Sequence, residues 1–258
     1  MLPEIDDYND LKGKFQSKLQ LVLNNNSNFR KFIYEIFIYG TAYVVGGFLR
    51  DIILNKTSRD LDMIVSLSHI QISEILNSSN LSYQMNRLKG FKIKLTDYEV
   101  DLWCLENNWA FKENLVVKND DNILDSISNG CFYNYDALVI NVHTNNLNIR
   151  HFKMFLETKK LDIIQKNTKY KKLNPTIEAN ILRAFYLRNL YGIDYSSNCN
   201  EYLLSRIGYL DDLYQSSINR LLEYKKKYKK YDDILTEVFI SDCISFCKNK
   251  SNQKSIEF

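Results

Sequence analysis

The stretch YVVGGFLRDIILNKTSRDLDMIVS, residues 43–66, decides how the first half of this chain folds. It opens on an apolar, β-branched run that predicts a buried strand. Gly46 and Gly47 follow, and glycine allows both a positive φ and a close approach of a ligand to the backbone. A short helix, a polar turn and a second strand over residues 60–65 are predicted next. The stretch therefore predicts a strand, glycine turn, helix and strand in sequence.

Two features of this stretch point to phosphate and metal chemistry. Backbone N–H groups at the start of a helix favour an anion, so the glycine turn is a candidate phosphate site. Asp60 and Asp62 lie two residues apart on a strand and therefore project from the same face. Carboxylates held this close repel each other unless a cation lies between them, and Mg²⁺ binds carboxylates together with substrate phosphates. Alone, each feature is more often a plain turn or a solvated strand end.

Taken together, the two features resemble the signature of class II nucleotidyltransferases, the group with bacterial CCA-adding enzymes and bacterial poly(A) polymerases. That signature is Gly-Gly-x-x-Arg-Asp, then Leu-Leu, then Asp-x-Asp. Here it stands as Gly46-Gly47-Phe48-Leu49-Arg50-Asp51, then Ile53-Leu54, then Asp60-Leu61-Asp62. The resemblance implies an α/β fold with a polymerase β-like head. It also implies metal-dependent transfer of a nucleoside monophosphate from an NTP to an acceptor hydroxyl, with an RNA (tRNA) 3′ end as the expected acceptor.

A third carboxylate is predicted on a later strand. Residues 91–95 and 98–105 alternate and predict a hairpin, and Glu99 and Asp101 share one face of its second strand. The resemblance favours Asp101 as the third ligand for Mg²⁺, with Glu99 as the alternative. It also implies that Asp60, Asp62 and Asp101 are the catalytic, metal-binding set, and that Gly46, Gly47, Arg50 and Arg183 contact the nucleotide.

The resemblance weakens after about residue 105. Residues 130–132 are Gly-Cys-Phe where the family has Arg-Arg-Asp, which implies that arginines for the ribose and triphosphate are absent. Leu182-Arg183-Ala184 is similar to the family's neck helix. Just upstream, however, Asn180 replaces an arginine that chooses the incoming base, and Glu178 is displaced by two positions. These departures leave the added nucleotide unassigned.

The hydrophobic pattern and the charge support two parts, a head over residues 1–150 and a helical, neck-like region over residues 151–258. In the head, Ser68 is a predicted cap for a helix through Leu76. In the second part, one helix is predicted from Lys153 to Ile164, and another from Thr176 to Tyr191, opened by Asn174-Pro175 and stopped by Gly192. The first part carries 15 Lys and Arg against 18 Asp and Glu, and the second carries 19 against 13. A basic second half is typical of contact with a polyanion, although a chance fluctuation explains it nearly as well. Five scattered cysteines indicate reduced thiols and a cytoplasmic protein, and no apolar run predicts a membrane span. The oligomeric state is not indicated.

Several interpretations stay open at this stage. Residues 224–231 mix lysines with tyrosines, which suits single-stranded RNA but also suits a solvated helix end whose tyrosines face the protein. Arg87, Lys89 and Lys92 either reach phosphates or form a solvated turn. For the whole chain, the alternatives to RNA 3′-end addition are modification of a small molecule or protein, and a catalytically silent RNA-binding module.

Overall fold

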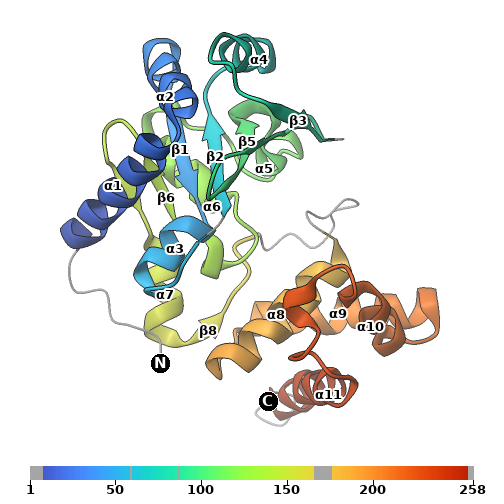
Figure 1. Ribbon diagram of the computed structural model, residues 1–258. Helices are drawn as coiled ribbons and strands as arrows, with labels where there is room; N and C mark the ends of the chain where they lie inside the picture. The colour runs from blue at the N-terminus through green and yellow to red at the C-terminus, as the bar shows by residue number, and fades with distance from the viewer. Residues whose placement is uncertain (1–7, 59, 87, 166–175, 255–258) are drawn as a thin grey trace. The chain divides into compact units, whose positions relative to one another are not determined.

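The structure is a computed structural model that describes residues 8–58, 60–86, 88–165 and 176–254. Its contacts divide these residues into two units, with the boundary between Glu157 and Thr158. Figure 1 shows the ribbon of each unit. We expected the boundary at residue 150, and the contacts place it seven residues later.

Two helices precede the sheet, α1 (Tyr8–Asn25) and α2 (Ser27–Tyr39). Their apolar residues recur at helical spacing, and Phe15, Phe29 and Phe32 are fully buried. Asn26 separates the helices because its side chain donates to the Val22 carbonyl instead of continuing the helical pattern. Helix α2 packs against β1, and α1 packs against α2 and α3; both are the blue helices in Figure 1.

A seven-stranded mixed sheet forms the centre of the first unit. Its order is β3-β4-β5-β2-β1-β6-β7, and β2 and β5 are its one parallel pair among the described residues. The strands are β1 (Ala42–Val45), β2 (Asp60–Val65), β3 (Tyr83–Met85), β4 (Phe91–Lys94), β5 (Glu99–Cys104), β6 (Val139–Asn141) and β7 (Leu147–Asn148). The expected α/β head with a mixed sheet is therefore confirmed.

Short helices connect these strands. They are α3 (Gly47–Ile53), α4 (His69–Ser78), α5 (Trp109–Lys112), α6 (Ile123–Asn129) and α7 (Arg150–Thr158), with 3₁₀ turns η1 (Leu105–Asn107), η2 (Asp120–Asn122) and η3 (Asn134–Asp136). Ser68 begins α4 with a capping box, as its position in the sequence predicts.

Helix α7 belongs to the first unit because its aromatic residues pack there. Phe152 and Phe155 are fully buried, and both contact the ring of Tyr135. We expected one helix from Lys153 to Ile164, which is wrong. The helix ends at Thr158, since Lys159 adopts a φ of +53° and the chain turns into a short strand.

The second unit is mainly helical, as expected. Its helices are α8 (Ile177–Tyr191), α9 (Ser197–Tyr214), α10 (Ser217–Lys225) and α11 (Glu237–Lys254), with the 3₁₀ turn η4 (Lys229–Tyr231). It also contains two short parallel strands, β8 (Lys160–Leu161) and β9 (Asp194–Tyr195), which the sequence analysis did not predict. The Asn174-Pro175 signal before α8 lies outside the described residues, but the helix begins after the Thr176 cap, one residue later than predicted, and ends before the left-handed Gly192 as predicted.

None of the helices that the structure describes is both long enough and apolar enough to span a bilayer.

Candidate active site

The glycine turn between β1 and α3 has the backbone geometry that the sequence predicts. Gly46 adopts φ +64° and ψ −115°, a conformation that residues with a Cβ rarely reach. Its N–H donates to the carbonyl of Leu138 at 2.9 Å, which ties the turn to the segment before β6. A Cβ on Gly47 would lie 3.5 Å from Arg50 Nη2 and 3.9 Å from Asp62 Oδ2. The Arg50 guanidinium and the Asp62 carboxylate therefore both lie close to the backbone of Gly47.

The predicted carboxylates come together on β2 and β5. In the parallel register, Asp62 lies opposite Asp101 and Asp60 lies opposite Glu99. The residues between them, Leu61 and Val100, are fully buried on the other face of the sheet. All four carboxylates therefore project from one face, on adjacent strands about 5 Å apart.

The electrostatics of this face confirm that the carboxylates interact. The pKa of Asp62 is raised to about 7, first by burial and then by the negative charges of Asp101, Asp60 and Asp136, while Arg50 opposes the rise. The pKa of Asp101 is also raised, chiefly by burial. The positive charge of Lys92 lowers this pKa, while the negative charges of Asp60 and Glu99 raise it. Because burial and crowding disfavour the charged forms of Asp62 and Asp101, a cation placed between them would be favourable.

The donor set fits a hard divalent ion such as Mg²⁺. Over the described ranges, no three carboxylate, thiol or imidazole groups are already gathered as a complete metal site. Magnesium does not need such a cage, since it is usually held by one or two carboxylates together with waters and substrate phosphates. Asp62 and Asp101, with Asp60 next to them on β2, can supply that pair of carboxylates.

Arg50 is held by groups on both sides of its guanidinium. Nη1 donates to Asp136 Oδ1 at 2.7 Å, Nη2 donates to Asp51 Oδ1 at 3.3 Å, and the group lies 4.6 Å from the centre of the Tyr135 ring. The Arg50 side chain is only 14% exposed. Its observed contacts are therefore those of a residue that braces α3 against the 135–136 segment, while contact with a nucleotide stays a prediction.

Asp136 belongs to this site through its contact with Arg50, although its place in the sequence did not indicate this. It lies 86 residues after Arg50, so no local spacing could reveal the ion pair. The one available signal was its position a few residues after Gly130-Cys131-Phe132, the stretch compared above with the family's Arg-Arg-Asp.

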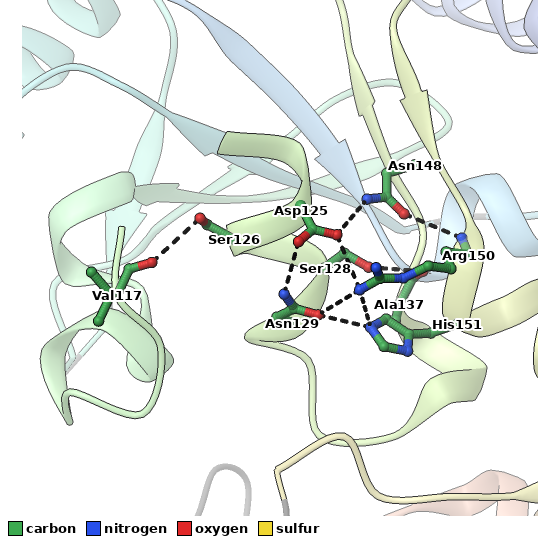
Figure 2. A network of polar contacts seen from close by, with 9 residues as sticks. All are labelled: Val117, Asp125, Ser126, Ser128, Asn129, Ala137, Asn148, Arg150 and His151. Carbon is green, nitrogen blue, oxygen red and sulfur yellow. Dashed lines mark hydrogen bonds and ion pairs between the residues drawn. The ribbon is translucent and has the colours of Figure 1, made fainter. Parts of the chain in front are cut away.

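A network of polar contacts joins α6 to α7, the helices that precede and follow the segment with Asp136 in the sequence (Figure 2). Arg150 Nη2 contacts Asp125 Oδ1 at 3.1 Å and Asn129 Oδ1 at 3.2 Å, and His151 Nε2 lies 2.8 Å from the same Asn129 oxygen. Asn129 Nδ2 donates to Asp125 and its Oδ1 accepts from Arg150 Nη2, while His151 Nε2 also lies 3.4 Å from Arg150 Nη2. The network joins α6 to α7.

The same helix α6 reaches the segment that anchors the glycine turn. Ser128 Oγ donates to the carbonyl of Ala137 at 3.5 Å, one residue before the Leu138 carbonyl that accepts from Gly46 (Figure 2). Helix α6 therefore links this network to the chain just before β6, where the Leu138 carbonyl accepts from Gly46.

The predicted residues of the second unit lie on α8. Arg183 is half-buried there, and its contact with a nucleotide stays a prediction. Glu178 is 7% exposed, and its Oε1 accepts from Arg220 Nε and lies 2.7 Å from both Nε and Nη2. Glu178 is therefore engaged in a buried ion pair within its own unit.

The lysine- and tyrosine-rich stretch, residues 224–231, buries its rings. Tyr224 and Tyr231 are buried, and Tyr228 contacts both of their rings. Lys227 and Lys230 stay exposed and lie over the tyrosine rings at 4.0 and 5.2 Å. The tyrosines face the protein, so the structure favours the helix-end interpretation over base stacking.

The head fold and the paired carboxylates define a class, the polymerase β-like nucleotidyltransferase head. Residues 42–118 match the family model described as the poly A polymerase head domain, and this segment contains Gly46, Gly47, Asp60, Asp62 and Asp101. Residues 42–118 are thus similar to the poly A polymerase head domain, in agreement with the resemblance found in the sequence. No curated protein matches the sequence at a significant level.

Solved structures of CCA-adding enzymes share the fold. A CCA-adding enzyme in complex with CTP matches with a TM-score of 0.63 and 16% identity over 94% of this chain and 55% of that one. The complex with ATP matches at 0.60 and 15%, over 90% and 51%. The Thermotoga maritima CCA-adding enzyme complexed with tRNA matches at 0.58 and 16%, over 90% and 51%. The chain thus spans about half the length of these structures.

Proposed function

We propose that this chain transfers a nucleoside monophosphate from an NTP to the 3′ hydroxyl of an RNA, with tRNA as the expected RNA. The observation that carries the proposal is the register of β2 and β5, which sets Asp62 opposite Asp101 with Asp60 alongside. This register lies within the segment that matches the poly A polymerase head domain. The similar structures of CCA-adding enzymes are complexes with CTP, ATP and tRNA, which supports an NTP and tRNA as the substrates proposed here.

The chain's own residues would act mainly by binding and orienting. Asp60, Asp62 and Asp101 would hold the divalent ion, and the turn at Gly46 and Gly47 would leave room for the triphosphate. When bound, Mg²⁺ would lower the pKa of the attacking hydroxyl and neutralise charge on the leaving pyrophosphate. Binding of the ion would also favour the ionised form of Asp62, whose pKa is raised to about 7 by burial and by the neighbouring carboxylates.

The test is a transfer assay with each of the four labelled NTPs, tRNA and Mg²⁺. We expect label on the RNA with the wild-type chain, and none with the double variant Asp60→Ala, Asp62→Ala. Asp121→Ala is the matched control, because Asp121 is an exposed carboxylate on η2 of the same unit. Label on protein or on a small molecule would contradict an RNA acceptor, and RNA binding without any label would contradict catalysis.

A further inference from the structure

A polar row crosses the open face of the sheet beyond the carboxylates. Asp62 on β2 lies opposite Asp101 on β5, and Asp101 lies opposite Lys92 on β4. Lys92 is exposed, while Phe91 and Ile93 on either side of it are buried on the other face. The next side chain after the third carboxylate, on the same face, is therefore a cation.

Lys92 is shared unequally between two carboxylates of β5. Its Nζ donates to Glu99 Oε2 at 3.0 Å and lies 3.9 Å from Asp101 Oδ1. The side chains of Lys92 and Glu99 are 45% and 47% exposed, and exposed ion pairs contribute little to stability. Lys92 therefore contributes little to the stability of the fold, and its main effect is to offset part of the negative charge of Asp101.

We propose that Lys92 is a positioning residue that sets the affinity of the head for its divalent ion, and that Glu99 acts by holding Lys92. This inference rests on the proposed function, because it concerns the same three carboxylates. Lys92 partly neutralises Asp101, so it competes with an incoming cation for that carboxylate. Glu99 draws the ammonium group toward itself and leaves Asp101 the more available of the two. On this basis Asp101 binds the ion, and Glu99 is not a ligand.

The size of the effect follows from the distance. A unit charge about 4 Å from Asp101 changes the binding of a cation about fivefold even at the dielectric constant of water, and more where solvent is partly excluded. Lys92→Met, which keeps the length of the stem and removes the charge, should therefore tighten divalent binding about fivefold. Lys94→Met is the matched control, because Lys94 is exposed on the same face of β4 and no ion pair joins it to a described residue.

The experiment measures metal binding to the full chain without nucleotide. Tb³⁺ luminescence excited through Trp103, two residues beyond Asp101 on the same face of β5, reports occupancy, and Mn²⁺ displaces it in competition. We expect Lys92→Met to lower the Mn²⁺ concentration for half-displacement about fivefold, and Lys94→Met to change it less than twofold. An unchanged or weakened affinity in Lys92→Met overturns the proposal.

A double-mutant cycle tests the role of Glu99. Glu99→Gln should weaken binding in the wild-type background, because Lys92 is then free to pair with Asp101. It should have little effect in the Lys92→Met background, whereas a ligand would cost the same affinity in both. An equal loss in both backgrounds overturns the assignment of Glu99.

A separate variant distinguishes this inference from the proposed function. If Asp101→Asn leaves Tb³⁺ binding intact, the carboxylates do not form the metal site and both proposals fail. If Asp101→Asn abolishes binding but Lys92→Met does not tighten it, only the inference about Lys92 fails. The Mg²⁺ concentration for half-maximal transfer should follow the same order as the Mn²⁺ affinities.

Discussion

The carboxylate of Asp62 should destabilise the fold at neutral pH, and Asp62→Asn should remove that cost. Burial and three neighbouring carboxylates raise the pKa of Asp62 from 3.8 to about 7 in the folded chain. Between these two values the folded state binds more protons than the unfolded state, so stability falls as pH rises from about 4 to about 7. Above pH 7 the full cost of ionising the folded carboxyl is present.

The shift sets an upper limit on the effect. About three pKa units at 1.36 kcal/mol each correspond to about 4 kcal/mol. Asp62 retains some solvent exposure, and water screens part of the repulsion. We therefore expect Asp62→Asn to gain about 2 kcal/mol at pH 8, or about 5 °C in Tm, and clearly less at pH 5.

The measurement is thermal unfolding of the full chain in EDTA at pH 5 and pH 8. Asp121→Asn is the control, because this exposed carboxylate should shift Tm at neither pH. Added Mg²⁺ should raise the Tm of the wild-type chain at pH 8 and leave that of Asp62→Asn unchanged. A Tm difference that is the same at both pH values, or a lower Tm for Asp62→Asn at pH 8, would refute the electrostatic reasoning.

Three further substitutions test the contacts around the site and in the second unit. Asp136→Ala should destabilise the head by about 1–3 kcal/mol in urea denaturation, because it removes the shortest ion pair of a largely buried arginine. Gly46→Ala should cost about 1–2 kcal/mol by the same measurement, since alanine is strained at φ +64°. Glu178→Gln should lower the Tm by several degrees through loss of about 1–3 kcal/mol, because it breaks the pair with Arg220. Glu223→Gln, at the exposed partner of the same arginine, should change the Tm by less than about a degree.

Local patterns were sufficient to predict much of the head. Apolar alternation identified β2, β4 and β5, and the Ser68 cap identified the start of α4, because each depends on residues a few positions apart. The shared face of Asp60 and Asp62 followed from the period of a strand alone.

Contacts between distant segments could not be predicted in this way. The position of Lys92 beside Asp101 depends on the register of β4 against β5, and the Arg50–Asp136 pair joins residues 86 positions apart. The ion pair of Glu178 with Arg220 similarly spans 42 positions. The early end of α7 at Thr158 was missed for a different reason. The residue that adopts the left-handed conformation after it is Lys159, and a lysine does not signal a helix end as a glycine would.

The bond from the Gly46 N–H to the Leu138 carbonyl has a consequence for when the site can form. A ribosome must release more than ninety further residues after Gly46 before this acceptor is available. The segment that matches the family model ends at residue 118, so a protein truncated there would keep the signature carboxylates but lose both Asp136 and the anchor of the glycine turn. During synthesis, the catalytic half should therefore mature only after β6 has emerged.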